Sequence, residues 1–123
     1  MEKTELKLRT KTFGLRVPKP VRNLPRDIPG KVVAQQLTRS ALSVGANYRS
    51  ACRGRFRAEF LSKLGVVLEE ADESAHWLEA IIEDGMLPES KVAALLQEAN
   101  ELTAIFFTAT STIRSRKDSL PNS

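Results

Sequence analysis

The chain has 123 residues, of which 41% are hydrophobic and 28% charged, and its formal net charge is +4 at pH 7. This length fits one domain with its own core and excludes two independent ones. The single cysteine, Cys52, excludes an intramolecular disulfide, and no uncharged stretch approaches the roughly 20 residues that cross a membrane. Because the charged N-terminal segment also lacks a signal-peptide pattern, we expect a cytoplasmic location.

Four segments carry apolar residues at helical spacing, and the connections between them are short. Their predicted bounds are residues 4–23, 28–53, 56–84 and 88–116. Inside the first segment, Pro18 and Pro20 each remove an amide donor and disfavour helical geometry in the preceding residue. A kink or a break is therefore predicted near Val17.

The ends of the other three segments are marked by residues that begin or end helices. Asp27 is placed to be the N-cap of the second segment. Gly54 and Gly85 follow the second and third segments, where glycine commonly ends a helix. Pro88 suits the first turn of the fourth segment, and fraying is predicted from Ser115 onward.

Helices of roughly 20 to 29 residues joined by short connections must fold back on one another to bury their apolar faces. The predicted fold is all-α, an antiparallel up-down-up-down four-helix bundle over residues 1–117, followed by a disordered tail over residues 118–123. Gly45, Ala46 and Gly65 are predicted to let neighbouring helices approach closely. The predicted buried stripe of the third segment is Phe60, Leu64, Val67, Leu68, Ala71, Ala75, Leu78 and Ile82.

Several of these helices also carry apolar residues on a face away from the predicted core. Single exposed leucines are ordinary in a monomer, but a set that spreads over several helices and includes a tryptophan favours contacts between subunits. We therefore expect an oligomer. The predicted interface residues are Leu8, Leu15, Leu42, Ala46, Val66 and Trp77.

The sequence offers few candidates for catalysis or metal binding. Glu73 and His76 have the Glu-x-x-His spacing of di-iron bundles, but such a site needs two motifs and His76 is the only histidine. A solvated acidic face is the better interpretation. Cys52 lies among arginines that favour a thiolate, yet no histidine-supported network accompanies it. We predict a protein that is not an enzyme and takes no cofactor and no metal.

Charge is divided unevenly along the chain. Residues 1–60 carry 14 Lys and Arg against 4 Asp and Glu, whereas residues 61–123 carry 5 against 11. The basic half points to an anionic partner such as a phosphate backbone, unless the two halves only neutralise each other on folding. The predicted nucleic-acid-binding residues are Arg39, Arg49, Arg53, Arg55, Arg57 and Lys63.

Two further expectations concern the surroundings of these arginines. Arginine side chains can grip phosphates with two hydrogen bonds, which gives salt-sensitive and largely sequence-independent binding. Alternatively, they pair with Glu59, Glu70 or Glu73 of a neighbouring subunit and serve assembly. The sequence does not indicate base stacking, because the nearby aromatic residues are expected mostly in the core. These aromatic residues are Tyr48, Phe56 and Phe60.

Three stretches together resemble the bacterial four-helix bundle proteins known from reading frames inside 23S rRNA intervening sequences. They are SVGANYR at 43–49, ACRGRFRAEF at 51–60 and KLGVVLEEADE at 63–73. The resemblance extends over residues 8–114 and implies a bacterial cytoplasmic protein that forms a homopentameric ring with a basic surface. It also implies kinship with the accessory proteins of diversity-generating retroelements, which partner a reverse transcriptase and nucleic acid. No catalytic activity is implied.

The residues and the resemblance lead to one functional hypothesis and one alternative. The hypothesis is a non-catalytic homopentamer that does not contact a membrane and binds structured RNA or DNA through its arginine-rich surface. The alternative is a scaffold or adaptor that recruits a protein partner and makes no direct contact with nucleic acid.

Overall fold

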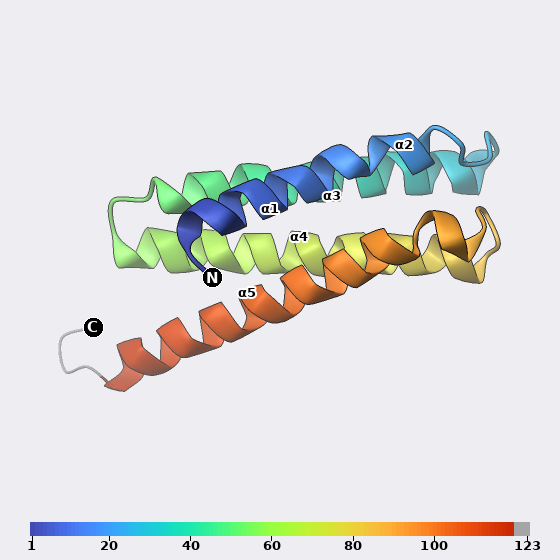
Figure 1. The fold of residues 1–123 in the computed structure, drawn as a ribbon. Helices are drawn as coiled ribbons and strands as arrows, with labels where there is room; N and C mark the ends of the chain where they lie inside the picture. Colours follow the sequence, from blue (N-terminus) through green and yellow to red (C-terminus); the bar gives the residue numbers. More distant parts are fainter. Residues whose placement is uncertain (120–123) are drawn as a thin grey trace.

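The structure, a computed structural model, describes the backbone of residues 1–119 and the side chains of residues 1–116. Over those residues the fold is entirely helical and contains no strand. The elements are, in chain order, α1 (Lys3–Arg16), α2 (Pro18–Val21), α3 (Ile28–Cys52), α4 (Arg57–Glu83), the 3-10 helix η1 (Glu89–Lys91) and α5 (Ala93–Ser119). Since α2 extends α1, the chain forms four helical segments that lie side by side (Figure 1). The predicted all-α class is confirmed.

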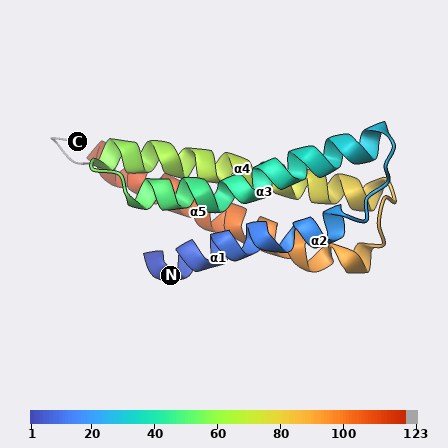
Figure 2. The same ribbon diagram turned by 90° about the horizontal axis from the view of Figure 1, so that it is seen from above.

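The predicted break in the first helical segment occurs at Val17, between α1 and α2. Pro18 and Pro20 lie in the first turn of α2, where a missing amide donor leaves few hydrogen bonds unmade. Val17 keeps right-handed helical angles, and its carbonyl accepts a hydrogen bond from the Val21 N–H at 3.2 Å. The chain therefore keeps its direction through the break, and α2 continues the line of α1 (Figure 2).

The bounds of α3 and α4 follow the predicted signals, whereas the start of α5 does not. The Asp27 side chain accepts a hydrogen bond from the Gly30 N–H at 2.9 Å and so caps α3. Gly85, with φ of +68°, follows the end of α4. Pro88 is not in the first turn of α5, because its ψ of 139° is extended and a 3-10 turn follows it. Val92 then interrupts the helix with φ of −129° while its side chain is buried.

The core runs along the bundle between the four helical segments, with Phe13 and Phe106 its largest fully buried side chains. In α4 the stripe turns slightly from the prediction, since Ile81 is buried and Ile82 only partly. Ser40 and Ser74 share a buried hydrogen bond of 2.9 Å that joins α3 to α4. Within the described residues, no helix is long and apolar enough to span a membrane.

Two glycines set the close packing of α1 on α3. A Cβ on Gly14 would lie 2.9 Å from the Ala41 carbonyl oxygen, and one on Gly45 would lie 3.0 Å from the Lys11 Cα. The predicted close approach at Gly45 is confirmed. The same prediction is wrong for Gly65, because no atom of another helix lies within 4 Å of where its Cβ would be. Backbone contact therefore explains Gly14 and Gly45 but not Gly65.

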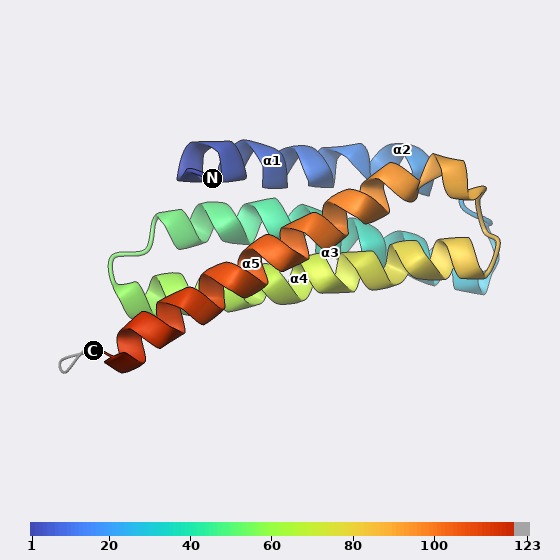
Figure 3. The same cartoon turned by 60° about the horizontal axis from the view of Figure 1, so that its bottom comes forward.

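Helix α5 packs mainly on α4 and crosses the other helices obliquely (Figure 3). Its link to α1 is polar: the Arg9 guanidinium hydrogen-bonds both oxygens of Glu98, at 2.6 and 2.7 Å, and contacts Glu101 at 2.9 Å. The hydrogen bonds to Glu98 raise the pKa of Arg9 above its usual value, so this residue stays charged. The helix extends to Ser119, past Ser115, where we expected fraying to begin. Residues 120–123 of the predicted tail lie outside the described residues.

Candidate nucleic-acid interface

The basic residues predicted to bind nucleic acid come from the end of α3, the connection after it and the start of α4. Arg49 lies in the last turn of α3, Arg53 is its C-cap and Arg57 is the first residue of α4. Arg55 lies in the connection between the two helices. All four side chains are exposed. This connection is at the end of the bundle where the N-terminus of α1 also lies (Figure 1).

Lys63, on the second turn of α4, belongs to the same region. It lines a shallow hollow with Arg53 and Glu59, and the other lining residues, Ser50, Gly54, Ala58 and Ser62, are small. We call the group formed by Arg49, Arg53, Arg55, Arg57 and Lys63 the basic end. The structure thus brings together five of the six residues that were predicted from the sequence to bind nucleic acid.

The cations of the basic end are not neutralised by neighbouring carboxylates. Among the side chains that the structure describes, none of these five forms an ion pair. Glu59, an acidic residue beside them, accepts a hydrogen bond of 3.0 Å from the backbone N–H of Arg55. Lys3 adds a further positive charge, since its Nζ lies 4.9 Å from the centre of the Phe60 ring. The basic end therefore has a positive potential that favours anions.

Arg39 does not belong to this group. It lies near the middle of α3, and its guanidinium forms ion pairs with Glu70, at 3.0 Å, and with Glu73 on α4. Arg39 thus pairs with both of these acids within its own chain. Because two carboxylates already surround Arg39, it has little charge to offer a phosphate.

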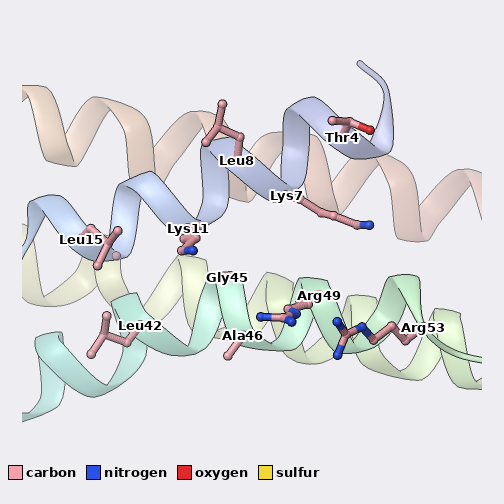
Figure 4. Close-up of a pocket in the computed structure, with 11 residues that line it drawn as sticks. Thr4, Lys7, Leu8, Lys11, Leu15, Leu42, Gly45, Ala46, Arg49 and Arg53 are labelled. Carbon is pink, nitrogen blue, oxygen red and sulfur yellow. The ribbon is translucent and has the colours of Figure 1, made fainter.

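A groove of about 570 Å³ runs between α1 and α3 and opens toward the basic end. Four of the predicted interface residues, from two different helices, meet in it, and its walls contain no acidic residue. Figure 4 shows Leu15 and Leu42 at one end of the groove and Arg49 and Arg53 at the other. The lining residues are Thr4, Lys7, Leu8, Lys11, Gly14, Leu15, Leu42, Gly45, Ala46, Arg49 and Arg53.

The apolar and basic surfaces, which were predicted separately, are one continuous surface. On α3 the groove residues Leu42, Ala46, Arg49 and Arg53 follow one another at helical spacing, so a single face changes from apolar to cationic along its length. Leu8, Leu15 and Leu42 have exposed fractions of 68%, 63% and 46%. Such a stripe of uncovered leucines is a candidate contact for another chain.

The other two predicted interface residues lie elsewhere. Val66 is partly buried and lines a small hollow on α4 with Leu61, Gly65 and Arg114. Trp77 is partly buried and packs against the core. Its ring lies edge-on to that of His76, with 4.9 Å between their centres, and its buried Nε1 has no hydrogen-bond acceptor among the described residues.

The residues considered for chemistry are dispersed. Over the described part of the chain, no group of three His, Cys, Asp or Glu side chains is placed to hold a metal ion. His76 is exposed on α4, and Cys52 is partly buried at the end of α3. Burial raises the pKa of the Tyr48 phenol, and the adjacent Cys52 raises it further, so Tyr48 remains neutral. Tyr48 and Cys52 therefore pack as part of the core, whereas His76 does not.

With this geometry in place, comparison with known proteins identifies the family. Residues 2–108 match the 23S rRNA-intervening sequence proteins. The chain belongs to that family. A similar solved structure is a protein of unknown function from the S23 ribosomal protein family of Bacteroides thetaiotaomicron VPI-5482. It is 26% identical, superposes with a TM-score of 0.80, and the match covers 90% of this chain and 99% of the other. No curated protein matches the chain.

Membership of the 23S rRNA-intervening sequence protein family confirms the resemblance inferred from the three motifs. The matched segment includes α1 to α4 and the first part of α5, so it contains the whole basic end and all of the groove. These features therefore lie on the framework that the family shares.

Sequence reasoning missed three residues of this surface. Lys7 and Lys11 line the groove, and their spacing of four residues on α1, next to Leu8, was a usable signal. Phe56 was expected in the core, and that prediction is wrong, because its side chain is 66% exposed. It lies at the N-cap of α4, outside the helical repeat that brings apolar residues to the core.

Proposed function

We propose that this member of the 23S rRNA-intervening sequence protein family binds structured RNA or DNA through the basic end, without catalysing a reaction. The observation that carries the proposal is the set of five exposed cations that have no ion-pair partner among the described side chains. Protein cations that contact phosphate groups displace the counterions condensed on the nucleic acid. The release of these counterions drives binding that does not depend on sequence. Glu59 is the acidic residue found beside these cations, so the basic end keeps an excess of positive charge that attracts phosphates.

Charge reversal at the basic end tests this proposal. In the triple variant Arg49→Glu, Arg53→Glu and Arg55→Glu, we expect affinity for a structured RNA to fall about 100-fold or more, because attractive contacts become repulsive. Fluorescence anisotropy with a labelled RNA hairpin measures the change. The thermal melt should stay close to that of the unmodified protein, since all three side chains are exposed.

A matched control separates a local site from a general effect of charge. Lys19, Arg22 and Arg26 are also exposed and lie around α2, at the opposite end of the bundle (Figure 1). Their simultaneous replacement by Glu changes the net charge by the same amount and should weaken binding far less. Equal losses in the two triple variants, or unaltered binding in the first, would refute a site at the basic end.

We further propose that the antiparallel bundle assembles into a homopentameric ring in the cytoplasm, with the apolar part of the α1–α3 groove among the subunit contacts. The exposed leucines of the groove support this, because subunit contacts would cover them. Light scattering should give a mass near five chains of 13.7 kDa each. A single-chain mass at micromolar concentration would contradict the ring.

The alternative function, in which this groove is not a subunit contact, is a scaffold that recruits a protein partner through the groove. Its mixture of apolar and cationic walls without any acidic residue favours an acidic amphipathic helix as the partner. A stoichiometric protein partner that survives nuclease treatment, together with no RNA affinity in the purified protein, would favour this alternative over nucleic-acid binding.

A further inference from the structure

Phe56 is an exposed aromatic residue in the middle of the basic end. Phe56 is 66% exposed, and the residues on either side of it in the chain, Arg55 and Arg57, are exposed cations. Phe60, one turn later, packs against the core instead. The connection therefore presents one uncovered aromatic residue, and exposed arginines precede and follow it in the chain.

The position of Phe56 is fixed by hydrogen bonds of the backbone around it. Its carbonyl accepts the Phe60 N–H at 3.1 Å, and the Arg55 N–H donates to the Glu59 carboxylate at 3.0 Å. On the other side, the Gly54 N–H donates to the Ala51 carbonyl at 3.1 Å. Because the turn is held from both sides, the backbone that carries Phe56 is already ordered before a ligand binds.

The stability of the fold does not explain a phenylalanine here. Phe56 is the N-cap of α4, a position that favours Ser, Thr, Asp or Asn because their side chains accept a hydrogen bond from the first turn. The phenyl ring provides no such bond, and α4 has no side-chain cap. With two thirds of its surface in water, the ring also contributes little burial.

An exposed ring beside cations is the arrangement by which proteins hold unpaired nucleotides, with a base stacked on the ring and the adjacent phosphates on the cations. Bases inside a duplex are already stacked on their neighbours and are not available to the ring. We propose that Phe56 is a stacking platform for an unpaired base, so that the ligand of the basic end is a nucleic acid with a single-stranded segment or loop. This inference rests on the proposed function and specifies its ligand.

The test compares Phe56→Ala with Phe107→Ala in the full chain. Phe107 is a matched control, because it is 62% exposed but lies on α5 between Phe106 and Thr108, without an adjacent cation. For a single-stranded oligonucleotide, Phe56→Ala should weaken binding about 5- to 100-fold. Phe107→Ala should leave it unchanged, and Phe56→Tyr should restore it, since a phenol ring also stacks. Binding of a blunt duplex of equal length should not respond to Phe56→Ala.

The outcomes distinguish failure of this inference from failure of the proposed function. If Phe56→Ala binds the single strand as well as the unmodified protein does, while the Arg49, Arg53 and Arg55 triple variant does not bind, the stacking platform is refuted and the basic end remains a phosphate site. If the unmodified protein binds neither nucleic acid, both ideas fail. If Phe56→Ala instead lowers the mass measured by light scattering, Phe56 is a subunit contact and the inference is overturned.

Discussion

Single residues decide where this molecule is closely packed and where it is charged. Gly14 and Gly45 let α1 lie against α3, since a methyl group at either position would meet backbone atoms of the other helix. Arg39 and Arg49 lie on the same helix, yet only Arg39 is held by acidic residues, Glu70 and Glu73. The difference depends on which residues of α4 face each arginine, and this follows from the packing of α3 on α4 rather than from the sequence near either arginine.

Replacing Gly45 or Gly65 by alanine should change the free energy of unfolding in opposite directions. Gly45→Ala should lower the free energy of unfolding by about 1 to 3 kcal/mol, because the new methyl group would crowd the α1 backbone. Gly65→Ala should raise it by about 0.5 to 1 kcal/mol, because alanine favours the helix and no atom obstructs the methyl group. Urea denaturation measures both values. Destabilisation by Gly65→Ala at a concentration where the protein is monomeric would show that the space around Gly65 is not open.

At the scale of elements, the sequence predicted the helices well because their ends depend on local chemistry. Asp27, Gly85 and the Pro18 and Pro20 pair each act on the backbone within a few residues, so their effect could be inferred without knowledge of the packing. The start of α5 could not be predicted in this way. Burial of Val92 is a tertiary contact, and it accompanies the interruption between η1 and α5.

The candidate site was predicted less completely for a related reason. Helical spacing identified the exposed faces of α1 and α3, but only the structure shows that Leu8 and Leu15 share one groove with Leu42 and Ala46. Phe56 lies in a connection, where helical spacing carries no information about burial, and counting aromatic residues as apolar placed it in the core. Residues in connections between helices therefore needed the three-dimensional structure most.

At the scale of the whole molecule, the folded chain separates its charges rather than neutralising them. The basic end brings together cations from α3, from the connection after it and from α4, and the α1–α3 groove adds Lys7 and Lys11. Farther along α4, the exposed residues Glu69, Asp72, Glu79 and Glu83 form an acidic face. Arg9 and Arg39 show that some charges of the two halves do pair, but each lies outside the basic end. The unpaired cations remain available to a partner of negative charge.

The affinity of the unmodified protein for a single-stranded RNA, measured at several salt concentrations, is the most direct test of phosphate binding at the basic end. If four or five cations of the basic end contact phosphates, the logarithm of the association constant should fall with the logarithm of salt concentration with a slope of about −3. An affinity that does not change between low and moderate salt, or no binding at low salt, would contradict a phosphate-binding surface at the basic end.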